Sequence, residues 1–357
     1  MADYSIKTVL TKNKKIKPDQ NKLSFGKYFT DHMFVMDYEE GIGWHEPKIV
    51  PNEPFSIDPA AMVFHYGQAV FEGMKAYKTA DGSINLFRPE ANFKRLNQSD
   101  ERMCIPHIDE EFALHALKEL IKVDAEWVPD AENTSLYIRP FVIATEAAVG
   151  VHPSKYYKFI ILLSPVGPYY PTGLAPVDIL VEDEYVRAVR GGIGFAKASA
   201  NYAISLKGQQ RAIEKGYAQV MWLDGIERKY IEEVGTMNVF FLINDELITP
   251  ELNGSILPGI TRDSVLTLAK SWGVKAVERK ISLEELLAAA KDGSLKEAFG
   301  AGTAAVISPI KNFVVGEEKT QVADGTTGEF SQKLYDNLTG IQYGKVADPF
   351  NWVQKVK

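Results

Sequence analysis

A glycine-rich segment leads to a lysine in the stretch Gly191-Gly192-Ile193-Gly194-Phe195-Ala196-Lys197-Ala198-Ser199-Ala200-Asn201-Tyr202. Glycines allow positive φ angles and let the backbone approach a bound molecule closely. An enclosed lysine can lose its proton and attack a carbonyl carbon. An exposed lysine after a flexible loop is the alternative, because most lysines lie at protein surfaces. Lys197 is therefore a candidate nucleophile that other parts of the sequence must support.

The composition is typical of a folded enzyme. The chain has 357 residues, of which 45% are hydrophobic and 24% charged, with a formal net charge of -7. This length favours two domains. The negative charge argues against a nucleic-acid partner, which would need clustered Lys and Arg. No apolar run is long enough to span a bilayer and no signal-peptide core is seen, so we expect a cytoplasmic protein with no membrane partner.

Cysteine and histidine usage argues against a metal centre. Cys104 is the single cysteine, so neither an internal disulfide nor a thiolate metal cluster can form. The six histidines are scattered, and no HExxH pair or similar ligand spacing occurs. We therefore expect no bound metal.

Residues 166–176 contain three prolines and two glycines near the middle of the chain, which is typical of a domain boundary. We predict an N-terminal α+β domain at 1–165, an interdomain loop at 166–176 and a C-terminal domain at 177–357 that carries Lys197. Runs rich in Val, Ile, Phe and Tyr predict strands. These runs are 33–38, 135–145, 158–164, 177–181, 218–223 and 238–243.

Apolar residues at helical spacing, together with start and stop signals, predict helices at 109–127, 200–215 and 261–272. The last of these has Pro258-Gly259 before it, Thr261 near its N-cap and Gly273 after its end. Ser282-Leu283-Glu284-Glu285 is a capping box that begins a further helix, which closes near Gly293. Helices and strands therefore mix in both halves of the chain.

Two loops of small residues are candidate anion sites. Leu257-Pro258-Gly259-Ile260-Thr261-Arg262 ends in a predicted helix start, where free backbone N–H groups and the helix dipole favour an anion such as phosphate. Phe299-Gly300-Ala301-Gly302-Thr303-Ala304-Ala305 would let backbone amides and the Thr303 hydroxyl approach a ligand. The respective alternatives are a plain turn with an N-cap and a tight strand-to-strand turn.

Three charged residues are further candidates. Glu233 stands between a charged turn and an apolar strand, and a buried acid needs a partner such as a heterocyclic N–H⁺; a solvated strand edge is the alternative. Arg95 and Arg139 can bind a phosphate or carboxylate through their planar guanidinium groups. Arg139 alternates with Tyr137 along a predicted strand, so both side chains face one side. An internal ion pair of Arg139 is the alternative.

Nucleotide motifs are incomplete. Gly192-Ile193-Gly194 begins like a dinucleotide fingerprint, but Lys197 stands where the third glycine belongs. The Walker pattern and the Gly-x-Ser-x-Gly elbow are absent. A nicotinamide-dependent oxidoreductase is therefore a remote alternative, and a non-catalytic binding module is another.

Taken together, these segments resemble the branched-chain amino acid aminotransferases, which are fold type IV pyridoxal phosphate enzymes. The resemblance rests on the order and spacing of motifs at 25–33, 65–75, 86–89, 135–140, 191–202, 233–238, 257–262, 299–304 and 341–344. It implies an α/β (α+β) fold with a smaller N-terminal α+β domain and a larger C-terminal α/β pseudo-barrel domain. The cofactor would lie at the domain interface.

The resemblance implies pyridoxal 5'-phosphate as the cofactor and assigns its contacts. Lys197 would form the internal aldimine and then shuttle the proton between the substrate α-carbon and the cofactor. Glu233 would bond the pyridine nitrogen, which makes the ring an electron sink, and Tyr202 would bond the phenolic oxygen. The phosphate would be held by Arg95, the backbone amides of Ile260 and Thr261, and Thr303.

The resemblance also implies a reaction. The amino group would pass between L-leucine, L-isoleucine or L-valine and 2-oxoglutarate, giving branched-chain 2-oxo acids and L-glutamate by a ping-pong mechanism. The α-carboxylate would meet Thr236, the Ala304 amide and a Tyr66 hydroxyl from the neighbouring subunit of a homodimer. Arg139 would receive the distal carboxylate of glutamate. An apolar pocket would be lined by Phe25, Phe71, Tyr137 and Tyr169.

The nearest alternatives share the fold: a D-amino acid aminotransferase or an aminodeoxychorismate lyase. The pair Tyr137 and Arg139, the Phe25 segment and the long N-terminal region favour the branched-chain enzyme. The preference among the three branched-chain amino acids stays open, since one methylene in a hydrophobic pocket changes binding by only about 1–3 kcal/mol.

Overall fold

The structure is a computed structural model that describes residues 5–169 and 173–356. Its contacts define two compact units. The first contains the described residues up to Tyr169, together with Ala196–Ala200 and the segment from Gly340 onward. The second contains residues 173–195 and Asn201–Thr339. Contacts therefore group Lys197 with the N-terminal half. The boundaries at 1–165, 166–176 and 177–357 stay a prediction, and positions 170–172 of that loop lie outside the described residues.

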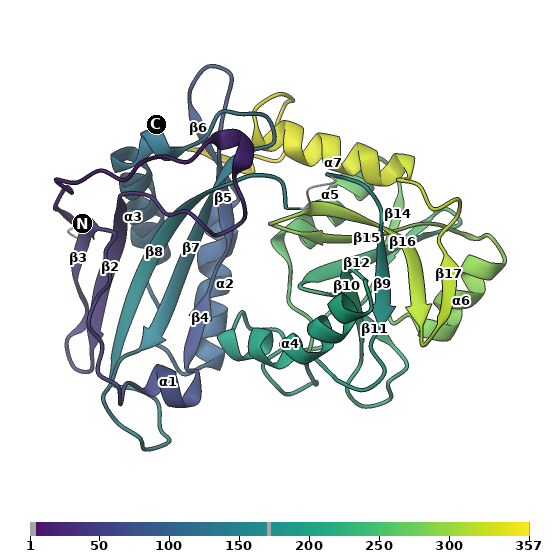
Figure 1. The fold of residues 1–357 in the computed structure, drawn as a ribbon, viewed down its shortest axis with the longest axis horizontal. Coiled ribbons are helices and arrows are strands. Elements are labelled where there is room, and N and C mark those ends of the chain that lie inside the picture. Colours follow the sequence, from purple (N-terminus) through teal and green to yellow (C-terminus); the bar gives the residue numbers. More distant parts are fainter. Residues whose placement is uncertain (1–4, 170–172, 357) are drawn as a thin grey trace. The chain divides into compact units, whose positions relative to one another are not determined.

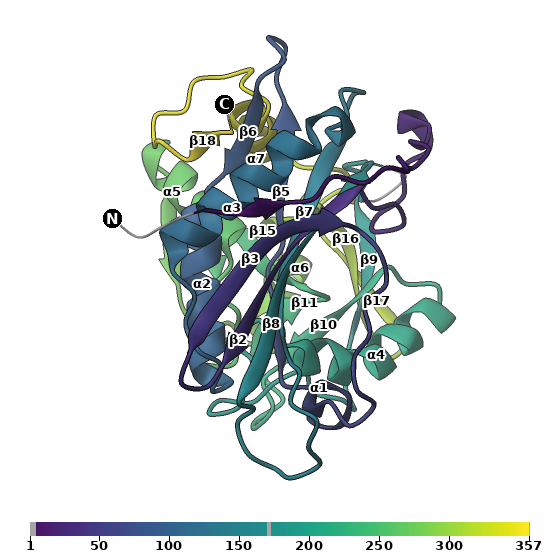
Figure 2. The same cartoon turned by 90° about the vertical axis from the view of Figure 1, so that its left-hand side faces the viewer.

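The first unit is built on a sheet whose strand pairs are antiparallel except for β1 with β3 (Figures 1 and 2). The strand order is β1-β3-β2-β8-β7-β5-β6-β18, and β4 pairs with β7 beside this path. The predicted strands at 33–38, 135–145 and 158–164 are confirmed as β2, β7 and β8. The bounds are β1 Lys7–Thr8, β2 His32–Glu39, β3 Gly43–Pro51, β4 Ala69–Phe71, β5 Met74–Lys78, β6 Ile84–Phe87, β7 Ser135–Ala144, β8 Tyr156–Val166 and β18 Val353–Lys355.

Helices α2 (Pro89–Arg102) and α3 (Glu110–Val123) pack on each other, and α3 also contacts β2. Asp109 caps α3 by accepting a hydrogen bond from the Phe112 N–H at 2.8 Å, which stabilises a helix by about 1 kcal/mol. The short helix α1 (Met62–Tyr66) and the 3₁₀ turns η1 (Gln20–Lys22) and η2 (Ala125–Trp127) complete this unit. The predicted apolar face of α3 is buried in full: Ala113, Ala116, Leu117, Leu120 and Ile121.

The second unit contains a closed ring of strands. Within residues 173–339, β11-β10-β9-β16-β15-β12 follow one another, and a further β11–β12 pairing closes the ring, while β13, β14 and β17 extend it. This arrangement confirms the predicted pseudo-barrel, and the strands at 177–181, 218–223 and 238–243 are β9, β10 and β12. The bounds are β9 Val177–Val181, β10 Gln219–Leu223, β11 Ile231–Val234, β12 Met237–Ile243, β13 Glu246–Thr249, β14 Lys275–Glu278, β15 Leu295–Gly302, β16 Val306–Val315 and β17 Glu318–Gln321.

The predicted helices at 200–215, at 261–272 and after Ser282 are confirmed as α4 (Ser199–Glu214), α5 (Ile260–Ser271) and α6 (Leu283–Lys291). Helix α7 (Glu329–Gln342) was not predicted. Ser282 Oγ accepts from the Glu285 N–H at 3.0 Å at the start of α6. Gly273 and Gly293, which follow α5 and α6, have φ angles of 77° and 80°. These left-handed conformations favour glycine and explain why each helix ends there.

Candidate active site

Lys197 lies just before α4, and residues of the first unit hold its backbone on both sides. Its N–H donates to Ser99 Oγ at 2.8 Å, and its carbonyl accepts from the Phe71 N–H at 3.0 Å. The Nζ atom lies 4.9 Å from the centroid of the Phe71 ring. Lys197 is half-buried, and both its neighbours, Ala196 and Ala198, are buried. This placement favours an enclosed amine over a freely exposed surface lysine.

The glycines before Lys197 are required by the packing of the loop itself. A Cβ on Gly194 would overlap the Ser255 carbonyl oxygen and the Ala188 side chain. Gly191 has a φ of 85°, in the left-handed region. We expected these glycines to make room for a ligand, but the space at Gly194 is filled by protein. The glycines therefore indicate a tightly packed loop, and this loop restricts the position of the Lys197 backbone.

Glu72 and Arg95 form a buried ion pair next to Lys197. Arg95 Nε and Nη2 donate to the two Glu72 oxygens at 2.7 and 2.9 Å, and Asn92 Nδ2 donates to Glu72 at 2.7 Å. Burial alone would raise the pKa of Glu72, but Arg95, the charge of Lys197 and Asn92 outweigh it and hold the pKa below its ordinary value. Glu72 therefore stays ionised and fixes the direction of the Arg95 guanidinium.

The predicted substrate residues of the first unit other than Tyr66 come together as one group. The Phe25 ring lies edge-on to those of Tyr137 and Tyr169, with centroids 4.7 and 5.7 Å apart. The Arg139 guanidinium lies 4.5 Å from the centroid of the Phe71 ring, and Arg139 Nη2 donates to the Tyr137 hydroxyl at 2.9 Å. Arg139 Nε is buried and has no hydrogen-bond partner among the described residues. An unused donor beside aromatic rings suits a ligand that carries both apolar and anionic groups.

Lys75 is a member of this neighbourhood that the sequence did not single out. It pairs with Tyr137 across β5 and β7, so both side chains lie on one face of the sheet. Lys75 is buried, and burial lowers its pKa to about 8. In the sequence it stands in the apolar stretch Gly73-Met74-Lys75-Ala76-Tyr77. A lysine in such a stretch is unusual, because lysines are rarely buried.

The Lys75→Met variant is expected to be more stable than the parent at pH 7. Lys75 has a lowered pKa in the folded protein, so its protonated form opposes folding by about 3 kcal/mol, and this penalty fades as pH rises from about 8 to 10.5. Urea unfolding of the apoprotein at pH 7 and at about pH 10 measures the effect. A variant whose advantage does not shrink at the higher pH would contradict it.

Tyr66 ends α1 and lies at the surface of the first unit. Its hydroxyl donates to the Val149 carbonyl, and 40% of the residue is exposed. Neighbouring large apolar residues of α1 and of the loop that contains Val149 are more exposed: Phe64 by 60%, Val149 by 67% and Val151 by 86%. Tyr66 therefore belongs to an apolar surface group, which we call the α1 patch.

Glu233 is buried in the second unit and is held from two sides. Arg187 Nη2 contacts its Oε2 at 2.6 Å, and Asn238 Nδ2 donates to its Oε1 at 3.1 Å. The exposed fraction of Glu233 is 4%. The prediction of a buried acid with a partner is confirmed over the solvated alternative, although the partner seen here is an arginine. Arg187 was missed because it is distant in the sequence and stands in no motif.

The two predicted phosphate loops lie next to Glu233 through strand pairing. Asn238 on β12 pairs with Glu233 on β11 and with Ala301 on β15, and Thr303 and Ala304 form the turn that follows β15. At the start of α5, Gly259 is the N-cap without a side-chain cap, and a Cβ there would overlap Asn238 Oδ1. A helix start and a hairpin turn thus lie beside one buried acid.

The other predicted residues of the second unit differ in burial. Tyr202 is half-buried on α4, and Thr236 is exposed in the β11–β12 turn. Ile260 and Thr261 form the first turn of α5. The structure therefore supports both readings of the loops: an N-cap and a strand-to-strand turn exist, and both present backbone amides that an anion can bind.

No group of three or more His, Cys, Asp or Glu able to hold a metal ion is found in residues 5–169 and 173–356. Among the same residues, no helix has both the length and the apolar character needed to cross a membrane.

Comparison with known proteins identifies relatives over the whole chain. Residues 69–313 match the family described as Amino-transferase class IV. The chain is 60% identical to branched-chain-amino-acid aminotransferase 2 of Bacillus subtilis, covering 100% of this chain and 98% of that protein. It is 57% identical to branched-chain-amino-acid transaminase 1 of the same organism, with 96% of each chain covered.

Solved structures show the same fold. The branched-chain amino acid aminotransferase of Escherichia coli superposes with a TM-score of 0.77 at 28% identity, covering 92% of this chain and 99% of that one. The T.th. enzyme of the same name, solved with pyridoxamine 5'-phosphate, gives a TM-score of 0.75 at 25% identity over 90% of this chain and 98% of that chain. The chain therefore belongs to the fold type IV aminotransferases and, within them, to the branched-chain-amino-acid aminotransferases.

Proposed function

We propose that the protein transfers the amino group between L-leucine, L-isoleucine or L-valine and 2-oxoglutarate by a ping-pong mechanism with pyridoxal 5'-phosphate. The observation that carries this proposal is the group of Phe25, Phe71, Tyr137 and Arg139, which combines aromatic rings with a half-buried guanidinium whose Nε is buried and unused. A ping-pong transaminase needs one pocket for both an apolar and an acidic side chain, because the two substrates bind in turn.

The side chains present suit the proposed cofactor. A phosphorylated pyridine aldehyde needs an amine for its carbonyl, an acid for its ring nitrogen and N–H donors for its phosphate. Lys197 offers the amine, Glu233 the acid and Tyr202 a partner for the phenolic oxygen. The phosphate donors would be Arg95, the amides of Ile260 and Thr261, and Thr303.

Each residue has a task in the proposed reaction. When bound, the cofactor supplies an electron sink for negative charge at the substrate α-carbon. Lys197 Nζ would take the proton from that carbon and pass it to the cofactor within the same half-reaction, and would move a proton in the reverse direction in the other half-reaction. Arg187 and Asn238 keep the Glu233 carboxylate fixed, so that it can hold a proton on the ring nitrogen. Glu72 orients Arg95 for the phosphate.

The substrate contacts follow from the same groups. Phe25, Phe71, Tyr137 and Tyr169 would contact the apolar side chains, and Arg139 Nε would donate to the distal carboxylate of glutamate. Thr236, the amide of Ala304 and the hydroxyl of Tyr66 would contact the α-carboxylate.

Arg139→Gln should separate the two half-reactions. Loss of the guanidinium removes the charged donor for glutamate and 2-oxoglutarate, so their kcat/KM should fall by about 10²-fold, since hydrogen bonds to charged groups contribute about 1.5–3 kcal/mol. Leucine should lose less than about threefold, because its side chain makes no such bond. Stopped-flow half-reactions with each substrate measure both values. An equal loss for leucine and glutamate would argue against Arg139 as the distal-carboxylate donor.

We also propose that the enzyme works as a homodimer in which Tyr66 reaches the neighbouring subunit. The α1 patch supports this, because its large apolar side chains are exposed together in the single chain. Sedimentation of the holoenzyme should give twice the chain mass of 39.8 kDa, and a Phe64→Lys change in the α1 patch should shift it toward the monomer. A monomeric parent enzyme with full activity would contradict the proposal.

A further inference from the structure

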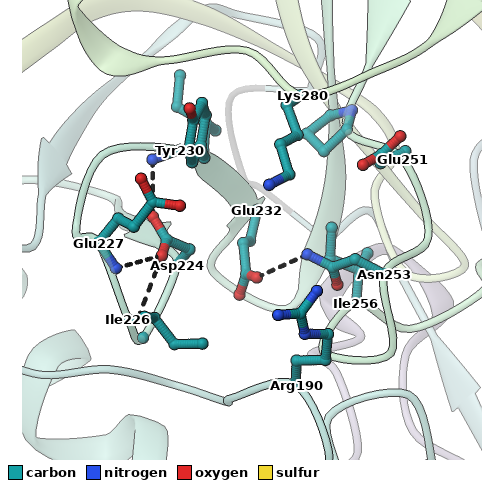
Figure 3. Close-up of a pocket in the computed structure, with 13 residues that line it drawn as sticks. Arg190, Asp224, Ile226, Glu227, Tyr230, Glu232, Glu251, Asn253, Ile256 and Lys280 are labelled. Carbon is teal, nitrogen blue, oxygen red and sulfur yellow. Dashed lines mark hydrogen bonds between the residues drawn. The ribbon is translucent and has the colours of Figure 1, made fainter.

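A polar cavity lies in the second unit beside β11. Glu232 is the unpaired residue of a β-bulge on this strand and lines the cavity, whereas Glu233 does not line it. The cavity has a volume of about 120 Å³. Its walls come from Arg190, the turn between β10 and β11, the loop before α5, and Lys280 (Figure 3).

The Glu232 carboxylate forms the floor of this cavity and is only half satisfied. Its Oε1 accepts from Ser255 Oγ and from Asn253 Nδ2. Its Oε2 is buried and has no hydrogen-bond partner in the described part of the chain. Only 3% of the residue is exposed. A buried carboxylate oxygen without a hydrogen-bond donor is unfavourable. An N–H or ammonium group of a ligand beside this carboxylate would lower that cost.

Two cations stand at the mouth of the cavity. Arg190 and Lys280 are exposed, and neither makes an ion pair with any residue in 5–169 or 173–356. The Lys280 Nζ lies 4.8 Å from the centroid of the Tyr230 ring, and in Figure 3 it points into the same space as the Glu232 carboxylate. Positive charge at the mouth suits an anionic group on the ligand.

The lining carries both signs of charge, with Arg190 and Lys280 beside the carboxylates of Asp224, Glu227, Glu232 and Glu251. No group of three or more His, Cys, Asp or Glu that could hold a metal ion is found among the described residues. An engineered cavity of roughly 150 Å³ takes a benzene molecule, so this one has room for about five to seven non-hydrogen atoms. A small zwitterion has both charges within that size.

We propose that this cavity is a binding site for a small free α-amino acid, with its ammonium group at the Glu232 carboxylate and its carboxylate toward Arg190 and Lys280. This binding does not depend on which reaction the enzyme catalyses. It differs from the candidate active site, because neither Glu233 nor Lys197 lines the cavity.

The site is connected to Glu233 by a short chain of hydrogen bonds. Ser255 Oγ donates to Glu232, and the Ser255 carbonyl accepts from Arg187 Nη2 at 2.6 Å. The same Arg187 Nη2 contacts Glu233 at 2.6 Å. A ligand that binds Glu232 and moves its carboxylate therefore also moves Ser255, and this changes the contact between Arg187 and Glu233. This second step rests on the proposed role of Glu233 at the cofactor ring.

Binding of labelled glycine to borohydride-reduced holoenzyme tests the site. Reduction fixes the cofactor to Lys197, so the probe cannot form an imine with the cofactor, and the variants below separate the cavity from noncovalent binding at the substrate position. We expect saturable binding of about one glycine per chain below about 50 mM, and at least about tenfold weaker binding in Glu232→Gln and Lys280→Gln. Lys229→Gln is the matched control, because Lys229 also lies over the Tyr230 ring, at 5.7 Å, but does not line the cavity.

Three results would overturn the proposal: no saturation, wild-type affinity in Glu232→Gln, or equal binding of methylamine, which lacks the carboxylate. The unreduced holoenzyme tests the coupling, since glycine in the cavity should shift the pH midpoint of the cofactor absorption band in the parent but not in Glu232→Gln. If the protein takes up no pyridoxal phosphate, the proposed function fails, and the same titration of the purified protein still tests the cavity.

Discussion

Replacing Lys197 with alanine should lower kcat for leucine transamination by about 10³-fold or more. The amine is the proposed acid and base at the substrate α-carbon, a role that contributes about 10²–10⁴-fold by itself, and it is also the proposed attachment point of the cofactor. The measurement is turnover of L-leucine with 2-oxoglutarate under saturating pyridoxal phosphate.

Lys207→Ala is the matched control for this loss, because Lys207 is exposed on α4 and has no proposed role. The Lys197→Ala protein should still bind the cofactor, now removable by dialysis, since the phosphate and ring contacts remain. Multiple turnovers at the parental rate in Lys197→Ala would refute the assignment of this residue.

Glu72→Ala should be among the most destabilising single changes in the first unit. It leaves the Arg95 guanidinium buried without its carboxylate, and breaking a buried ion pair by removing one partner costs about 3–5 kcal/mol. Urea unfolding of the apoprotein at pH 7 measures this loss. The stabilisation by Glu72 also depends on pH, because folding lowers the pKa of this carboxyl group. The stabilisation is fully present above the ordinary glutamate pKa and is lost as the pH falls from there through the lower pKa of the folded protein.

A double variant separates the unpaired charge from the loss of packing. Glu72→Met with Arg95→Met removes both charges together, and replacing a whole buried pair by apolar residues is often close to neutral. We expect the double variant to regain most of the stability lost in Glu72→Ala while failing to bind pyridoxal phosphate tightly. Equal instability of the single and double variants would show that packing, and not charge pairing, dominates at this position.

Local signals in the sequence predicted the elements that depend on local physics. The apolar face of α3, the capping box at Ser282 and the glycines after α5 and α6 each act within a few residues, and the structure confirms them. Strands dense in branched and aromatic residues, such as β7 and β9, were also predicted. By contrast, β15 contains glycine and alanine in Phe299-Gly300-Ala301-Gly302, and only its place in the closed ring makes it a strand.

The missed residues of the candidate site are those whose role arises from contacts between distant parts of the chain. Ser99 holds the Lys197 backbone from α2, and Arg187 holds Glu233 from the loop after β9. Neither stands in a motif that single-sequence reasoning can detect. Glu72 and Lys75 left a weaker signal, as charged residues inside an apolar run, and a rule that every buried charge needs a partner would have found them.

The most direct test of the account is a single half-reaction of the holoenzyme with L-leucine, followed by absorption spectroscopy without any 2-oxo acid. The account predicts conversion of the pyridoxal form to the pyridoxamine form with release of one equivalent of the branched-chain 2-oxo acid, and no such conversion in Lys197→Ala. D-Alanine is the control substrate and should leave the spectrum unchanged. Conversion by D-alanine but not by L-leucine would contradict the proposed function and would favour a D-amino acid aminotransferase.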